Sequence, residues 1–370
     1  MKLVAVARVK NEADIIEPFV RHHIQHFDKV IVLDDGSTDG THQLLRQLQS
    51  TSRDLVVLSQ PTIGYMQHAH MTMLLRMAAD SFGADWIAPL DADEFIEPTD
   101  GLLLAQILAD RQPAVYRLAW SNFIWTPSLE ESGERNPVLR QRFRLAPRMD
   151  KTKLVLHAQF VSGAAELGSG NHFLTHCGRP VPTQPLDEVQ LCHYPVRSIA
   201  QYAGKIAIGH LQYLATPNWD RGTGFHYIKP FQELANFGLT GISKLVSHDS
   251  LFYSLEESEQ VKHHPESVEA PLNYLGGPLT LKPPDNSILS NVLRYAEMVA
   301  VEFAEKCQDL DRVSSETAFL RKRLSELETE LRSLQGEVGR QARQLQSRTF
   351  TLLTRIYEIL IRAKILRPRP

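Results

Sequence analysis

Cysteine is scarce in this 370-residue chain, and the three that occur lie far apart. Cys177, Cys192 and Cys307 form no Cys-x-x-Cys pair, which argues against a disulfide framework or a cysteine zinc site and fits a reducing compartment. No apolar run approaches the roughly 20 residues needed to span a bilayer, and the apolar run 3–7 is too short for a signal peptide. We therefore expect a cytoplasmic protein, with peripheral contact at the inner face of the cell membrane left open.

The chain also lacks an excess of charge of either sign. Its 40 basic and 43 acidic side chains give a net charge of −3, which provides no electrostatic case for a nucleic-acid partner. The apolar content of 43% is ordinary for a globular protein, and the length allows one large domain or two smaller ones. No Gly-x-Gly-x-x-Gly follows the first expected strand, which disfavours a Rossmann dehydrogenase.

The first hundred residues alternate short apolar runs with amphipathic stretches. The pattern predicts strands at 3–9, 29–33, 55–58 and from 86 to 90, with helices at 12–27, 41–49 and 66–82 between them. Further strands are expected at 115–120, 154–158 and 191–195, and a helix at 198–213. Strands that alternate with helices predict an α/β domain with a mostly parallel sheet, whose ligand binds beyond the carboxyl ends of the strands.

Three acids follow the strand expected to begin at Trp86. Asp91, Asp93 and Glu94 stand within four positions, and carboxylates this close repel one another unless a cation neutralises them. Oxygen ligands at an Asp-x-Asp spacing suit Mg²⁺ or Mn²⁺, ions that commonly also hold the phosphates of a substrate. A solvated acidic turn is the alternative.

Two more polar clusters follow the first and second expected strands. The runs are Arg8-Val-Lys-Asn-Glu12 and Asp34-Asp35-Gly36-Ser37-Thr38-Asp39-Gly40. The two glycines predict a tight strand-to-helix turn, in which Ser37 or Thr38 can equally cap the next helix, and Glu12 can equally be a first-turn helix residue. Because the carboxyl ends of parallel strands share one edge of a sheet, three clusters there predict a binding site.

These motifs resemble the family-2-type glycosyltransferases of the GT-A fold. The resemblance rests on the runs 6–12, 32–41 and 91–95 and covers roughly residues 1–240. Within it, Asp-x-Asp-Glu-Phe95, Lys153-Leu-Val-Leu-His157 and Cys192-His-Tyr-Pro-Val-Arg-Ser198, followed by Lys205 and Gly209, are similar to the branch related to glycosyltransferase family 92. The resemblance implies a hexosyltransferase of polysaccharide biosynthesis. It would move a sugar from a nucleotide sugar, most plausibly a UDP-sugar, to a glycan or glycolipid acceptor with inversion.

The resemblance also implies which residues hold the donor and the ion. The residues expected around the nucleotide sugar are Arg8, Asn11, Glu12, Asp34, Asp35 and Asp91. Asp93 is the preferred ligand of Mn²⁺ or Mg²⁺, with Asp91 beside it and His193 completing the shell, while His157 is a rival for that last place. The ion would stabilise the departing diphosphate.

The base that an inverting transfer needs stays unassigned. The family branch usually has Glu-Arg-Phe where this chain has Gln141-Arg-Phe143, so that acid cannot be carried over. The acids that remain as candidates lie in a polar loop after Trp125 or just before His193, and are Glu131, Glu134, Asp187 and Glu188. The aromatic run that includes Trp120 and Trp125 either forms a platform for sugar rings or belongs to the core.

The C-terminal part has a heptad pattern. Apolar residues alternate in steps of three and four from Leu310 to Leu345, and Gln341 is the one polar seam position. The pattern predicts a coiled coil and a parallel homodimer; a helix that folds back on its own domain is the alternative. We expect a GT-A domain at 1–245, a linker at 246–290, a coiled coil at 291–348 and a basic amphipathic tail at 349–370. The tail either lies on an anionic membrane surface or packs on its own protein.

Two other functions stay open. A coiled-coil scaffold with a degenerate transferase domain would keep the fold without the activity. A sugar nucleotidyltransferase also combines an α/β sheet with Mg²⁺ held by acids, but that class normally has a glycine-rich loop after the first strand, and the run from Arg8 to Glu12 has no glycine.

Overall fold

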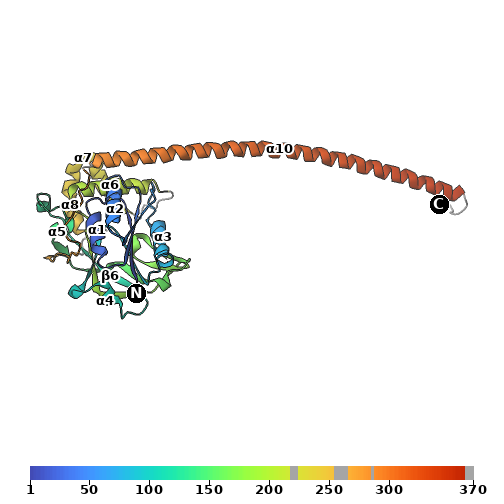
Figure 1. Ribbon diagram of the computed structural model, residues 1–370. Helices are drawn as coiled ribbons and strands as arrows, with labels where there is room; N and C mark the ends of the chain where they lie inside the picture. The colour runs from blue at the N-terminus through green and yellow to red at the C-terminus, as the bar shows by residue number, and fades with distance from the viewer. Residues whose placement is uncertain (217–223, 254–265, 285–286, 363–370) are drawn as a thin grey trace. The chain divides into compact units, whose positions relative to one another are not determined.

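The computed structural model describes residues 1–216, 224–253, 266–284 and 287–362. The chain divides into two compact units, Met1–Val299 and Ala300–Pro370. The described residues of the first unit form a mixed α/β domain, and those of the second belong to one helix (Figure 1).

An eight-stranded sheet forms the centre of the first unit. Its order is β3 (Leu55–Ser59), β2 (Lys29–Asp34), β1 (Leu3–Val9), β4 (Trp86–Leu90), β8 (Arg148–His157), β6 (Val115–Asn122), β12 (Gln184–His193) and β5 (Glu94–Pro98). Neighbours from β3 to β4 are parallel, as are β6 and β12, whereas β8 and β5 run antiparallel to their neighbours. The expected α/β fold with a mostly parallel sheet is confirmed.

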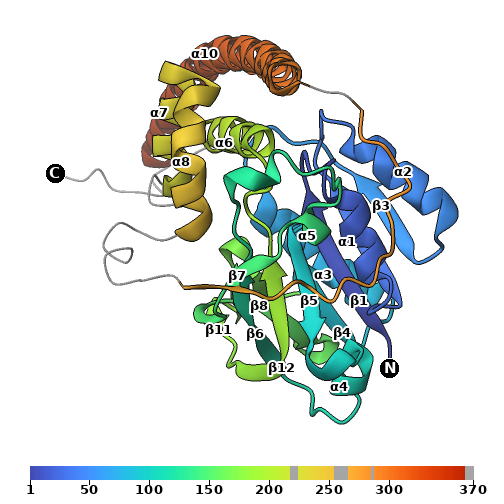
Figure 2. The same ribbon diagram turned by 90° about the vertical axis from the view of Figure 1, so that its left-hand side faces the viewer.

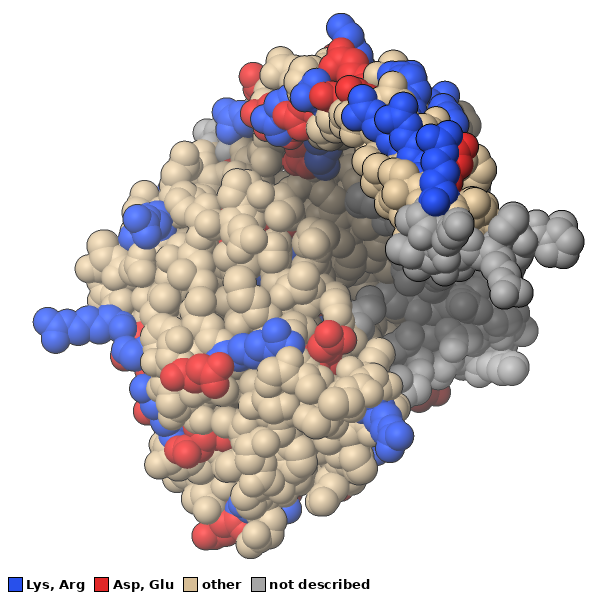
Figure 3. All heavy atoms as spheres, turned by 90° about the vertical axis from the view of Figure 1, so that its right-hand side faces the viewer, with Lys and Arg blue, Asp and Glu red and all other residues tan. Residues whose placement is uncertain are grey.

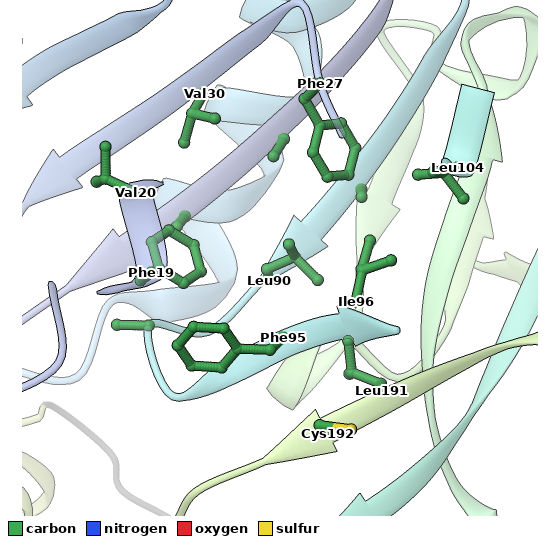
Figure 4. Close-up of a cluster of buried hydrophobic side chains, with 14 of the residues drawn as sticks. Phe19, Val20, Phe27, Val30, Leu90, Phe95, Ile96, Leu104, Leu191 and Cys192 are labelled. Carbon is green, nitrogen blue, oxygen red and sulfur yellow. The ribbon is translucent and has the colours of Figure 1, made fainter. Parts of the chain in front are cut away.

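The central strands are apolar throughout because helices cover both faces of the sheet. Successive side chains of β1 point to opposite faces: Ala5 and Ala7 join the core under α1 (Ile16–His23) and α2 (Thr41–Thr51), while Val4 and Val6 join the core under α3 (Gln67–Asp80) (Figure 2). Figure 4 shows the first of these cores, in which Phe19 lies against Phe95. These two layers fix the strand ends at which the polar clusters stand.

Helices from the second half of the unit add a third cluster of buried residues. Side chains of α6 (Ile199–Leu214), including Tyr202 and Ile206, pack with α7 (Ile228–Phe237) and with Ile242 of α8 (Leu239–Leu251). Shorter elements are α4 (Leu104–Leu108), α5 (Pro137–Arg140) and two small sheets. These sheets are β9 (Ala165–Leu167), β10 (Leu174–His176) and β11 (Arg179–Pro180), and β7 (Phe143–Leu145) with β13 (Ser267–Glu269).

The last helix, α10 (Ile288–Arg362), begins inside the first unit. Tyr295 is fully buried there beside Ile63 and Ile208, and its hydroxyl donates to the carbonyl of Ile63 (2.5 Å). Beyond Val299, nearly every residue of the helix is exposed. None of the described helices combines the length and the apolarity that crossing a membrane requires. The final residues of the expected tail, 363–370, lie outside the described residues.

Most predicted elements have the expected place, with different ends. The predicted helix 198–213 is α6, and the predicted strand 154–158 is the end of the longer β8. The strand expected at 191–195 corresponds to the ten-residue β12, which begins at Gln184. Its first half was not predicted because those residues are polar and partly exposed and form no apolar run. The segment expected as a linker contains the end of α8 and β13, and its backbone N–H groups at Thr280 and Leu281 donate to Glu17.

Candidate active site

The acidic turn after β4 is held by two lysines from later elements. Asp91 accepts hydrogen bonds from Lys153 of β8 (2.6 Å) and Gln67 of α3 (2.9 Å). Asp93 is almost fully buried and accepts from Lys205 of α6 (2.9 Å). The sequence predicted that a cation must neutralise this cluster, and in the chain itself these ammonium groups do so. Burial alone would raise the pKa of Asp93, but Lys205 and the neighbouring basic groups hold that pKa well below its ordinary value.

His193 at the end of β12 faces Asp93. Its Nε2 lies 3.6 Å from Asp93 Oδ2, and its Nδ1 lies 2.7 Å from Asn122 Oδ1. Since a carbonyl oxygen only accepts, Nδ1 carries the ring proton and Nε2 has a free lone pair. Burial lowers the pKa of His193 to about 4, so the ring is neutral at pH 7. A carboxylate oxygen and an unprotonated ring nitrogen thus lie close together at the end of β12.

Asp34 ends β2 and Asp35 follows it, and both carboxylates lie beside basic or histidine side chains of the chain itself. Asp35 is fully buried, and its carboxylate accepts from Arg8 and from Thr62 N (2.7 Å) and Oγ1 (2.5 Å). Lys10 Nζ lies 3.9 Å from the same carboxylate. Burial lowers the pKa of Lys10 to about 8. Asp35 therefore orients two basic side chains, and its buried neighbour Asp34 lies 3.4 Å from His42.

The loop after β1 is anchored from the far end of the sheet. Arg197, which is fully buried after β12, donates to Glu12 (2.5 Å) and to both oxygens of Asp14 (2.7 and 2.9 Å). Asn11 has a left-handed backbone (φ 59°) and accepts through Oδ1 from Thr38 N (2.7 Å). The loops after β1 and β2 are thereby tied together at the carboxyl edge of the sheet.

A cavity of about 340 Å³ opens at this edge. Its basic lining is Arg8, Lys10, Lys153 and Lys205, and its acidic lining is Glu12, Asp91 and Asp93. Aromatic side chains complete the wall: Tyr65 and Tyr213 stack at 4.4 Å, and Trp120 stacks on His193 at 4.1 Å. The arrangement offers cations for an anionic ligand and flat apolar faces for rings.

Residues 6–162 match the model of glycosyl transferase family 2. Over somewhat less than half of its length, the chain is therefore similar to glycosyl transferase family 2. Among curated proteins, no sequence matches.

Solved transferase structures are similar to this chain at low identity. TarS 1–349 of S. aureus in complex with UDP is 13% identical, over 71% of this chain and 78% of that one, with a TM-score of 0.33. The mannosyltransferase PcManGT of Pyrobaculum calidifontis in complex with GDP-Man and Mn²⁺ is 15% identical, over 70% and 78%, with a TM-score of 0.35.

The matched region, residues 6–162, and the elements after it bring together most of the predicted site. Arg8, Asn11, Glu12, Asp91, Asp93 and His193 all line the cavity, whereas Asp34 and Asp35 lie behind its wall. His157 is at the other end of β8, where its ring packs against Trp86. Phe123 is buried against Tyr194, and Trp125 belongs to the cluster under α6.

The acids considered as catalytic bases lie elsewhere. Of the residues that the structure describes, Glu131, Glu134, Asp187 and Glu188 are not among those that line the cavity. Glu188 pairs with Arg111, and Glu134 accepts from the backbone N–H of Asn136 (2.7 Å). Gln141, at the position of the missing family acid, is buried and donates to the carbonyls of Ile124 (3.2 Å) and Val196 (2.7 Å). It acts as a tie between core segments.

Sequence reasoning gave no role to four basic or aromatic residues of the site. Lys153, Arg197 and Lys205 appeared only inside or just after the motifs, without a role of their own, and Tyr295 was in none of them. One signal was present: Lys153 directly precedes the apolar run 154–156, and a lysine buried beside such a run requires a charged partner. Tyr295 gave no such signal. It lies far beyond the family match, yet Lys10 Nζ lies 5.1 Å from the centre of its ring.

The donor set of the cavity fits a divalent cation that also binds phosphate. No three His, Cys, Asp or Glu side chains converge as a complete ligand set in the described part of the chain. Asp93 Oδ2 and His193 Nε2 lie 3.6 Å apart and are an oxygen and a nitrogen donor of the kinds that such an ion accepts. Mg²⁺ and Mn²⁺ are commonly held by one or two protein groups together with substrate phosphates, so two ligands suffice.

Proposed function

We propose that the protein transfers a sugar from a nucleoside-diphosphate sugar to a hydroxyl group of a glycan or glycolipid. The observation that carries the proposal is the pair Asp93 and His193, which face each other across 3.6 Å inside a cavity with four basic side chains. A diphosphate carries the negative charge that such a cavity accommodates, and a divalent cation would bridge it to the protein. The match to glycosyl transferase family 2 supports the reaction class.

The residues of the chain have separate tasks in this proposal. Asp93 and His193 would hold Mn²⁺ or Mg²⁺, which when bound neutralises the charge that develops on the leaving diphosphate. Arg8 and Lys10, oriented by Asp35, would contact the donor's phosphates or its base. Lys205 is hydrogen-bonded to Asp93 and brings a further positive charge to the same place.

The donor that we propose is a UDP-sugar, and the reaction is displacement with inversion at the anomeric carbon. Stacked Tyr65 and Tyr213 present an aromatic surface beside Arg8, whose guanidinium lies 5.5 Å from the centre of the Tyr65 ring. Such a surface suits a planar base. The remaining aromatic lining, Trp120, Tyr227 and Tyr253, would bind the sugar rings. Location at a membrane, where glycolipid acceptors are found, would follow from the basic tail that begins at residue 349.

Binding of nucleoside diphosphates in the presence and absence of Mn²⁺ tests the proposal. We expect calorimetry to detect UDP binding that Mn²⁺ strengthens by at least about tenfold, which is about 1.4 kcal/mol. Asp93→Asn and His193→Gln should remove the Mn²⁺ effect. The matched control is Asp85→Asn, which changes the exposed aspartate just before β4 and should bind as the wild type does. No binding of UDP or GDP to the folded wild type would refute the proposal.

A further inference from the structure

The part of α10 in the second unit carries an exposed apolar seam. Its apolar members between Leu310 and Leu345 have exposed fractions from 46% at Leu327 to 67% at Leu310. They recur in steps of three and four, which on an α-helix places them along one stripe. The seam positions are Leu310, Val313, Thr317, Leu320, Leu324, Leu327, Leu331, Leu334, Val338, Gln341 and Leu345.

A helix of this length needs a packing partner for its apolar stripe. Helices in water gain most of their stability from burial of an amphipathic face. The described residues of the second unit, 300–362, form one helix with no second element of that unit to pack against. A contiguous exposed apolar stripe rimmed by charges is the mark of an interaction surface. Basic and acidic side chains both lie on the surface of this helix (Figure 3).

We propose that residues 310–345 pair with the same residues of a second copy of this chain as a parallel, in-register, two-stranded coiled coil. In this register Leu310, Thr317, Leu324 and their heptad successors occupy position a, and Val313, Leu320 and Leu327 position d. One polar residue of the seam, Gln341, pairs with itself only when the two chains are in register, which is how polar core residues fix alignment.

The charges beside the seam favour the parallel orientation. Positions g and e of a parallel pair face each other five residues apart. Glu316 then faces Arg321 of the second copy, and Arg323 faces Glu328, so that both contacts attract. The antiparallel arrangement that places Leu324 opposite Leu327 would instead bring Glu316 against Glu337. Only the parallel pair avoids a repulsive contact.

The mass of the full-length protein in solution tests the seam. We expect light scattering to give twice the chain mass of 41.9 kDa. Leu320→Glu with Leu327→Glu should give the chain mass, because buried carboxylates would face each other at two layers. Ala318→Glu with Ser325→Glu, which adds the same charges at the same spacing on the outer face, should stay dimeric. A monomeric wild type would refute the proposal, and a dimeric seam variant would show that another surface pairs the chains.

UDP binding and thermal unfolding of the seam variant separate loss of pairing from loss of folding. The first unit should unfold at the wild-type temperature and bind UDP as the wild type does, since the substitutions lie in the second unit. A shared failure of wild type and variant to bind UDP would concern the proposed function and leave the coiled coil unaffected.

A disulfide and a charge exchange test the orientation. In a chain with Cys177 and Cys307 changed to Ser, Thr317→Cys should cross-link two copies under mild oxidation, because position a meets itself only in a parallel pair. Glu316→Lys should weaken self-association, and adding Arg321→Glu should restore it. An antiparallel pair would give no Thr317→Cys cross-link, and Glu316→Lys would strengthen it by relieving the repulsion at Glu337.

Discussion

Acid should destabilise this protein well before its carboxylates titrate, because three histidines are buried: His22 and His23 at the end of α1, and His26 just after it. His22 Nε2 donates to the carbonyl of Ile96 (2.8 Å), and His23 Nε2 accepts from the N–H of the same residue (3.4 Å). Strand β5 is the last strand of the sheet, so it has no neighbouring strand on its outer side. The two rings therefore provide the hydrogen-bond partners of the Ile96 backbone, beside the acidic turn. His26 packs against His22 with ring centres 4.9 Å apart.

The magnitude follows from linkage between protonation and folding. Burial lowers the pKa of His22 to about 3 and that of His26 to about 4, from 6.5 in the unfolded chain. The unfolded state therefore binds protons first, and stability is complete above pH 6.5 and is lost as the pH falls towards 4. Between pH 7 and pH 5, protonation of each ring lowers the free energy of unfolding by about 1.8 kcal/mol, or by about 4 kcal/mol for both. This is a large part of the roughly 5–15 kcal/mol that is typical of a folded protein.

Urea unfolding followed by tryptophan fluorescence at pH 7, 6 and 5 measures this loss. His26→Phe keeps a ring against His22 and removes one titrating group, and in the described structure neither nitrogen of His26 has a hydrogen-bond partner. At pH 7 we expect the free energy of unfolding of this variant to equal or exceed that of the wild type. Between pH 7 and pH 5 that free energy should fall by about 1.8 kcal/mol less than in the wild type. His176→Gln, at the exposed end of β10, is the control. Equal acid losses in wild type and His26→Phe would refute the reasoning.

Three further outcomes are expected. Since the pKa of Lys10 is lowered to about 8, UDP affinity should fall as the pH rises through 8, and Lys10→Arg should remove that fall; a fall of unchanged size in calorimetry would contradict it. Lys153→Met should lower the free energy of unfolding by about 3–5 kcal/mol, because it leaves Asp91 and buried Glu94 without their shared cation; urea unfolding at pH 7 checks this. Tyr295→Ala should weaken UDP binding, whereas Tyr295→Phe, which keeps the ring beside Lys10, should bind nearly as the wild type does; equal affinities in a titration would exclude a positioning role.

The ends of the parallel strands were the most predictable part of this protein. Apolar runs bounded by polar clusters located β1, β2 and β4, and the parallel pairing placed Glu12 and Asp91 at one edge as expected. The glycine-rich turn was also predictable, because Gly36 and Gly40 have positive φ angles (69° and 98°). At Gly36 a β-carbon would lie 2.8 Å from Pro61, so close approach adds to the conformational requirement.

The partners of each polar side chain were not predictable, because they come from distant segments. Asp35 was expected at the ligand, and only the coordinates place Thr62 and Arg8 on its oxygens. The helix cap was expected at Ser37 or Thr38, but Asp39 accepts from the N–H of Thr41 (3.0 Å), while Ser37 accepts from Asn11 N (2.9 Å). Local sequence gives the type of a residue, and the neighbours that decide its role are set by tertiary packing.

The acidic turn explains why the proposed donor site should depend on residues far beyond the family match. Its carboxylates come from the β4–β5 connection, within residues 6–162, but Lys205 and Arg197, which approach Asp93 to 2.9 and 3.8 Å, lie after β12. Without these two cations, the buried carboxylate of Asp93 would keep an uncompensated charge, at a cost of several kcal/mol. A fragment that ends at residue 162 should therefore lack a stable acidic turn. The site is complete only when α6 is in place, and the matched region alone should not bind the donor.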